Sequence, residues 1–300
     1  MKSRKLLKEA ARLAEPYCVS DGAKFKLKEF DPGDTNGMKS KKTAEELLAS
    51  SSELLAEMQE KLYAQDRWAL LLIFQGMDAA GKDGAIKHVM SGINPQGCDA
   101  YSFKAPTHEE LNHDFLWREH KVMPERGKIG IFNRSYYEEV LIVRVHPQLI
   151  KGEKLPENLI TKHIWEERYE DINAFERYVT RNGVIIRKFF LHISRAEQKK
   201  RFLSRLEDST KNWKFEMNDI KERKFWRDYQ EAYEEMVQNT ATKRAPWYVI
   251  PADNKWYARL VVASAIIQTL GALDLAFPDV DKEKKKELNE IREALVESKD

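Results

Sequence analysis

The residues with the clearest chemical potential form the glycine-rich segment Gly76-Met-Asp-Ala-Ala-Gly-Lys-Asp-Gly84. Its G-x-x-x-x-G-K spacing is typical of a P-loop, in which glycines let the backbone approach phosphate oxygens and the lysine adds positive charge. P-loops usually have Ser or Thr after the lysine, but here Asp83 follows it and Asp78 lies inside the loop. We therefore expect a loop that binds phosphate and holds its metal through carboxylates. The residues expected to contact phosphate or nucleotide there are Gly76, Ala79, Ala80, Gly81, Lys82, Asp83 and Gly84.

Further candidate residues follow two other predicted strands. The segment ending in Ser102-Phe-Lys-Ala-Pro-Thr107 presents Lys104 and Thr107, which could reach a phosphate or an acceptor, although a surface lysine and a turn would explain them equally well. Another strand ends in Asn133, where P-loop enzymes usually have an acid that organises Mg²⁺. Arg134 comes next and would point into the same crevice, unless it only forms a salt bridge at the strand end.

The acids available for a metal are Asp78 in the loop and Glu138, one turn into the next helix. Positive residues then gather between about 195 and 230, a pattern that indicates a helical lid closing over phosphates. Solvated helix faces would explain many of them as well. The basic residues of this segment are Arg195, Lys199, Arg201, Arg205, Lys211, Lys214, Lys221, Arg223, Lys224 and Arg227.

The elements that must position these residues alternate between strand and helix. Strands are predicted at 70–74, 98–103, 128–133, 184–193 and 247–250, with helices at 109–120, 135–145, 160–181, 195–207 and 219–239. This alternation predicts an α/β three-layer fold, with a central parallel sheet of about five strands and helices on both faces. Ligands of such sheets bind at the carboxyl ends of the strands.

Three regions are expected along the chain. Residues 1–42 are expected to form an N-terminal appendage, 43–277 the P-loop domain, and 278–300 a charged C-terminal tail. The sequence Thr43-Ala-Glu-Glu46 reads as a capping box that opens the helix before the P-loop strand.

Composition limits the classes of protein and partner. The chain has 300 residues, 42% of them apolar, and a net charge of +2 despite 51 basic residues, so we expect no general affinity for nucleic acid. Two cysteines and the lack of an apolar leader favour the reducing cytoplasm. The longest apolar stretch, 260–277, contains Ser264, Gln268, Thr269 and Asp274, so we expect a packed helix and no membrane span.

Taken together, the motifs resemble those of the polyphosphate kinase 2 family, and the N-R-S-x-Y-E form resembles its class III branch. They occur in order over about residues 25–275. The segments that carry the resemblance are Gly76 to Gly84, Ser102 to Thr107, Phe132 to Val140, Val143 to His146, Phe189 to Ser194, Ala245 to Ala252, and Trp256.

The resemblance implies a P-loop kinase-like fold and a role for each matched residue. Asp78 would help to hold Mg²⁺, with Mn²⁺ as an alternative, and Lys82 would contact phosphates. Arg134 would stabilise the transferred group, and Glu138 would bind metal or acceptor. Other implied contacts with phosphate or nucleotide are those of Asn133, Arg144, Arg195 and Lys214. The family is implied to form homodimers or homotetramers.

These features favour an enzyme that moves the terminal phosphate of inorganic polyphosphate directly to AMP, ADP or both. Two alternatives remain at this point. An ATP-dependent nucleoside monophosphate kinase would share the fold and lid, but would have Ser or Thr where Asp83 stands. A non-enzymatic nucleotide sensor would explain neither the extra acid in the loop nor the basic lid.

Overall fold

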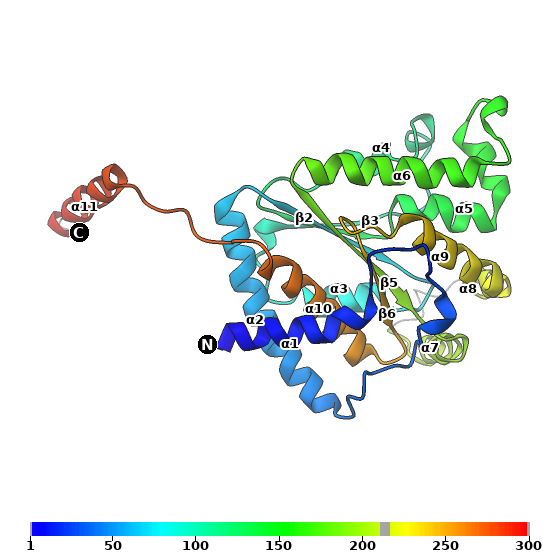
Figure 1. The fold of residues 1–300 in the computed structure, drawn as a ribbon, viewed down its shortest axis with the longest axis horizontal. Coiled ribbons are helices and arrows are strands. Elements are labelled where there is room, and N and C mark those ends of the chain that lie inside the picture. Colours follow the sequence, from blue (N-terminus) through cyan, green and yellow to red (C-terminus); the bar gives the residue numbers. More distant parts are fainter. Residues whose placement is uncertain (1, 211–216, 299–300) are drawn as a thin grey trace.

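The computed structural model describes residues 2–210 and 217–298, whose strands form one six-stranded sheet in the order β1-β6-β5-β2-β4-β3 (Figure 1). Five strands are parallel, as predicted: β2 (Ala69–Gln75), β3 (Cys98–Ser102), β4 (Ile129–Asn133), β5 (Val184–His192) and β6 (Trp247–Pro251). The sixth, β1 (Cys18–Val19), runs antiparallel to β6. With only two residues, it is too short for an alternation pattern to reveal.

Helices cover both faces of the sheet, which gives the three layers expected from the sequence. On one face, α10 (Lys255–Gly271) contacts α1 (Lys2–Ala14), α2 (Lys41–Gln65) and α3 (Lys82–Val89). On the other, α9 (Trp226–Thr240) contacts α5 (Ile142–Val145) and α6 (Ile164–Arg181) (Figure 1). Strand β2 is buried at every residue because it lies between β4 and β5 and under both layers. Its apolar run is therefore dictated by burial on two faces.

The N-terminal segment packs on the sheet domain. Helix α1 lies against α10 and buries Ala10 and Leu13, and Tyr17 is buried just after it. The next helix, α2, begins earlier than predicted. Its N-cap is Ser40, whose Oγ accepts a hydrogen bond from the backbone N–H of Thr43. Thr43 is thus inside the first turn, and the predicted start at Thr43 is wrong.

Two segments expected to be helical are mostly tighter turns. Residues 109–120 contain a 3-10 turn at Glu110–Asn112 and the short helix α4 (Trp117–His120). Residues 135–145 contain a 3-10 helix at Tyr136–Val140 and then α5. Ser135 accepts from the N–H of Tyr137, and Leu141, with φ of −114° and ψ of −89°, separates the two pieces. A continuous α-helix cannot pass through that backbone conformation.

The expected lid region consists of α7 (Arg195–Glu207), α8 (Met217–Glu222) and a 3-10 turn at Arg223–Phe225 that leads into α9. The predicted residues Lys211 and Lys214 lie outside the described residues. Helix α11 (Lys282–Glu297) follows a linker and lies away from the sheet in Figure 1, with every described side chain exposed. Further 3-10 turns lie at Glu15–Tyr17, Leu27–Glu29, Pro95–Gly97, Pro147–Glu153 and Glu157–Leu159.

Within residues 2–210 and 217–298, none of the helices combines the length and apolar character that a membrane span requires.

Candidate active site

A cleft of about 950 Å³ opens at the carboxyl ends of β2 and β4. Its walls come from the P-loop, from the segments after β3 and β4, from the lid helices and from the first turns of α10. Most residues singled out in the sequence meet there. Those that line the cleft are Gly76, Asp78, Ala79, Ala80, Gly81, Lys82, Asp83, Gly84, Lys104, Asn133, Arg134 and Glu138.

The P-loop conformation explains its glycines. Gly76 has a φ of +154°, and a Cβ there would lie 2.9 Å from the carbonyl oxygen of Leu191 on β5. Gly81 has a φ of +102° and forms the N-cap of α3. Between them, the N–H of Ala80 donates to the carbonyl of Met77 and closes the turn. The N-terminus of α3 lines the cleft, and the amides of a helix N-terminus favour an anion.

Lys82 is the buried cation of the loop. Its Nζ donates to the carbonyl oxygens of Gly76 at 2.5 Å and Met77 at 3.4 Å. Burial first, and then the nearby charge of Arg134, lower the lysine pKa from 10.5 to about 8. An arriving phosphate would add negative charge beside this ammonium group and raise its pKa.

Arg134 joins the loop to the segment after β4. Its φ of +66° turns the chain sharply, and its N–H donates to the carbonyl of Phe74 on β2 at 2.9 Å. Its Nη2 donates to Asp78 Oδ1 at 2.8 Å, while Nη1 lies 3.7 Å from Glu138 Oε2. Glu138 and then Asp78 raise the pKa of the guanidinium despite its burial. The two predicted metal carboxylates thus converge on one arginine.

Asp83 and Asn133 are partners, which explains two departures from the usual P-loop pattern at once. Asn133 Nδ2 donates to Asp83 Oδ1 at 2.8 Å. Ordinary P-loop enzymes place a hydroxyl donor after the lysine and an acid at the end of the neighbouring strand. Here the acid stands in the loop and the amide donor stands on the strand, and the two are joined by a hydrogen bond.

The donor set suits a hard divalent cation. Asp78, Asp83 and Glu138 supply carboxylate oxygens at the cleft. Within the described ranges, no group of three or more His, Cys, Asp or Glu side chains is arranged as a complete metal cage. A Mg²⁺ ion requires no such cage, because it is commonly held by one or two carboxylates together with substrate phosphates.

Arg201 makes structural contacts that the sequence did not reveal. It was counted among the lid cations, but its guanidinium is buried and donates to the carbonyls of Ala79 at 2.9 Å and Ala80 at 2.8 Å. The same group donates to the carbonyls of Ala252 and Asp253 after β6. Arg201 therefore fastens the P-loop to the neighbouring strand end.

Helix α10 adds two further cations that the sequence analysis passed over, Lys255 and Arg259. A Cβ on Gly84 would lie 3.8 Å from Arg259 Nη2, so this guanidinium lies beside the P-loop helix. Among the described residues, no carboxylate lies within ion-pair distance of it. Lys255 and Arg259 are four residues apart on α10, and this spacing puts two side chains on one face of a helix. The spacing could have identified them in the sequence as a pair of cations on one helix face.

Three described residues of the predicted site, and a fourth outside the described ranges, are not among those that line the cleft. Thr107 and Glu110 exchange hydrogen bonds and close a local turn. Arg144 pairs with Glu235. Arg195 is exposed at the first turn of α7, and Lys214 lies outside the described residues. Their contact with phosphate or nucleotide stays a prediction.

Comparison with known proteins agrees with this architecture. Residues 38–277 match the family profile of polyphosphate kinase 2. The chain is 48% identical over 282 residues to the ADP-polyphosphate phosphotransferase of Rhodopseudomonas palustris, covering 93% of this chain and 97% of that protein. It is 44% identical over 263 residues to the AMP/ADP-polyphosphate phosphotransferase of Meiothermus ruber, covering 87% and 94% respectively.

A solved structure is similar over nearly its whole length. The crystal structure of polyphosphate kinase 2 from Arthrobacter aurescens TC1 has a TM-score of 0.86 to this chain at 42% identity, covering 95% of this chain and 97% of that one. Because the profile match covers well over half of the sequence, the chain belongs to the polyphosphate kinase 2 family.

Proposed function

We propose that this protein transfers the terminal phosphate of inorganic polyphosphate directly to AMP, ADP or both. The observation that carries the proposal is the convergence of Asp78 and Glu138 on Arg134 beside a buried P-loop lysine. Relatives of 48% and 44% identity bear the names ADP-polyphosphate and AMP/ADP-polyphosphate phosphotransferase, which supports both acceptors.

The chemistry requires no protein nucleophile. An oxygen of the acceptor phosphate attacks the terminal phosphorus of polyphosphate, and the phosphoanhydride bond to the next phosphate breaks. The shortened chain leaves with the bonding electron pair, and the nucleotide gains one phosphate. This exchange is limited mainly by alignment and by negative charge on the transferred group. Arg134 and Lys82 supply fixed positive charge, and the amides at the start of α3 supply hydrogen bonds.

Asp78 and Glu138 are proposed to hold Mg²⁺, with Mn²⁺ as a substitute. The ion would neutralise phosphate oxygens and bring donor and acceptor into line. Arg134 keeps both carboxylates in place beforehand through its contacts with Asp78 and Glu138. The Asn133 amide fixes Asp83 at the mouth of the loop.

Polyphosphate is proposed to lie along the basic wall of the cleft, and residues 195–230 to act as the lid. The cations that line this wall are Lys104, Arg205, Arg223, Lys255 and Arg259. A chain of phosphates carries negative charge on every unit, so several separated cations can bind it where a single site could not. We also propose the division into 1–42, 43–277 and 278–300, a cytoplasmic location and a homodimer or homotetramer.

The proposal is tested by supplying purified protein with Mg²⁺, polyphosphate and AMP or ADP in the absence of ATP. We expect ADP and ATP to accumulate while the polyphosphate shortens, as followed by chromatography and ³¹P NMR. Incubation with labelled polyphosphate and no nucleotide should leave the protein unlabelled. Absence of nucleotide products would refute the proposal, and a labelled protein would refute direct transfer.

A further inference from the structure

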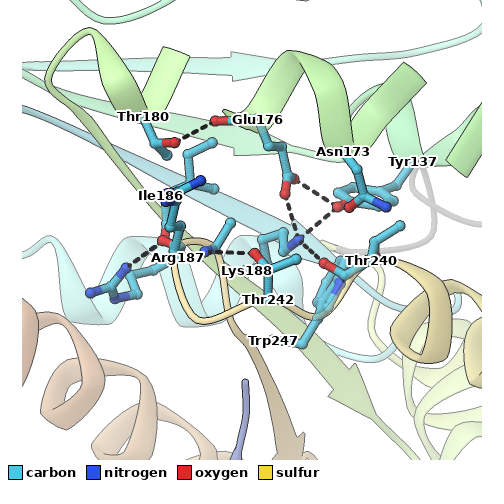
Figure 2. Close-up of polar contacts among 12 residues, drawn as sticks. Tyr137, Asn173, Glu176, Thr180, Ile186, Arg187, Lys188, Thr240, Thr242 and Trp247 are labelled. Carbon is cyan, nitrogen blue, oxygen red and sulfur yellow. Dashed lines mark hydrogen bonds and ion pairs between the residues drawn. The ribbon is translucent and has the colours of Figure 1, made fainter. Parts of the chain in front are cut away.

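A buried lysine lies in the middle of the sheet and does not line the cleft. Lys188 is at the centre of β5 and its side chain is fully buried. Figure 2 shows its Nζ donating to three oxygens: Tyr137 Oη, Glu176 Oε2 and the carbonyl of Thr240, each at 2.8 Å. All three ammonium hydrogens therefore have acceptors.

The acceptors are themselves saturated and belong to different elements. Glu176, on α6, accepts at Oε1 from the hydroxyls of Tyr137 at 2.7 Å and Tyr136 at 3.0 Å. Thr240, the last residue of α9, accepts at Oγ1 from Trp247 Nε1 at 2.9 Å. The network thus joins α6, β5, the end of α9 and the 3-10 helix after β4.

Stability alone does not explain why a charged pair stands here. Burial lowers the pKa of Lys188, which shows that its charge is costly at this place. A buried ion pair can often be replaced by apolar side chains with no loss of folding stability. We therefore infer that this pair serves mainly to hold its partners in one arrangement.

What the network fixes is the segment that carries the proposed catalytic groups. Tyr136 and Tyr137 lie between Arg134 and Glu138 in the sequence, and both tyrosines are fully buried. Their hydroxyls are tied to Glu176, and Tyr137 is tied to Lys188 as well. The segment turns sharply at Arg134 and lacks a regular α-helix, so its position depends on contacts with other elements. The buried Arg168 holds Glu139 farther along the segment, whereas the Lys188–Glu176 pair holds the two tyrosines that stand directly between Arg134 and Glu138.

We propose that Lys188 and Glu176 are positioning residues, which hold Arg134 and Glu138 at the distance needed for phosphoryl transfer through the two buried tyrosines. Neither residue lines the cleft. The inference rests on the proposed roles of Arg134 and Glu138. It means that the Lys188–Glu176 pair contributes to turnover although neither side chain reaches the cleft.

The test separates turnover from stability. The double variant Lys188→Met/Glu176→Gln removes both charges and leaves an acceptor for the tyrosine hydroxyls. Tyr137→Phe removes a single hydroxyl. Arg187→Met is the matched control, because Arg187 is the neighbouring residue of β5, donates to Thr269 on α10 and has no contact with the tyrosines. Thermal unfolding, kcat and the KM for polyphosphate are measured for each.

We expect the double variant to unfold within a few degrees of the wild type, with kcat reduced about 10- to 100-fold and KM changed less than about threefold. Tyr137→Phe should reduce kcat in the same direction, and Arg187→Met should leave it near wild type. Amide exchange in residues 134–141 should be faster in the double variant. If that variant does not fold, Tyr137→Phe decides.

Wild-type kcat in the double variant, or in Tyr137→Phe, would overturn the proposal. So would an equal loss of kcat in Arg187→Met, because the effect would then be a general response to change in β5. The wild-type protein is assayed alongside. If it makes no nucleotide products, the proposed function is wrong. Amide exchange in residues 134–141 then decides whether Lys188 and Glu176 hold this segment in place.

Discussion

The pKa of Lys82 leads to a specific prediction about pH. Burial places this pKa at about 8, so about half of the free enzyme has a charged lysine at pH 8 and about a tenth at pH 9. Only the charged form attracts phosphate. The kcat/KM for polyphosphate should therefore be nearly constant below about pH 7, fall about fivefold between pH 8 and 9, and fall about tenfold for each further pH unit. Bound phosphate raises the lysine pKa, so kcat should fall at a higher pH than kcat/KM does.

The same burial has a cost in stability. A pKa lowered from 10.5 to about 8 corresponds to at most about 3 kcal/mol, partly offset by the hydrogen bonds to Gly76 and Met77. Between pH 8 and 10.5 the unfolded chain binds this proton and the folded chain has released it. The contribution of Lys82 to the free energy of unfolding should therefore rise with pH between pH 8 and 10.5. Lys82→Met should be inactive and at least as stable as the wild type at pH 7.

The assay is initial-rate ATP formation from ADP and polyphosphate at constant ionic strength and free Mg²⁺. Lys82→Arg is the control, because arginine stays charged throughout this range. Glu119 and Glu139, whose burial raises their pKa to about 8 and about 7, remain in that variant. Its residual activity should lack the alkaline fall. A wild-type kcat/KM that is constant to pH 9, or an unchanged fall in Lys82→Arg, would refute the reasoning.

Three substitutions test other parts of the site. Asp78→Asn should reduce kcat about 100-fold or more while thermal unfolding is unchanged, and near-normal turnover would remove Asp78 from the metal role. Arg201→Met leaves buried carbonyls of the P-loop without donors, so urea unfolding should show a loss of about 3 kcal/mol; an unchanged free energy of unfolding would contradict its fastening role. Arg259→Ala should raise the KM for polyphosphate about tenfold at constant kcat, since a charge-assisted contact contributes about 1.5 kcal/mol, and a wild-type KM would exclude Arg259 from that groove.

Local patterns were enough to predict the sheet and the loop. Strand β2 is apolar because it is covered on two faces, and Gly76 and Gly81 are dictated by backbone angles that other residues rarely adopt. Both signals lie within a few neighbouring residues. The Asn133–Asp83 hydrogen bond joins residues 50 positions apart, so each looked like a separate departure from the P-loop pattern.

Charge alone was a poor guide to the role of the basic residues. Arg201 and Arg195 stand six residues apart on α7, yet one is buried against the P-loop and the other is exposed. A run of basic residues does not tell which face of the helix meets the core. The turn at Leu141 and the two-residue strand β1 were missed because tertiary contacts, more than local periodicity, determine them.

The identity of the phosphate donor is the central claim, and a comparison of two donors tests it most directly. AMP is supplied as acceptor with either polyphosphate or ATP as the sole donor, at equal concentrations of transferable phosphate, and the initial rate of AMP consumption is measured. The site described above predicts rapid consumption with polyphosphate and a rate lower by at least about tenfold with ATP. Faster consumption with ATP would contradict it and favour an ATP-dependent nucleoside monophosphate kinase. No consumption of either AMP or ADP, when each is supplied with polyphosphate, would also contradict it.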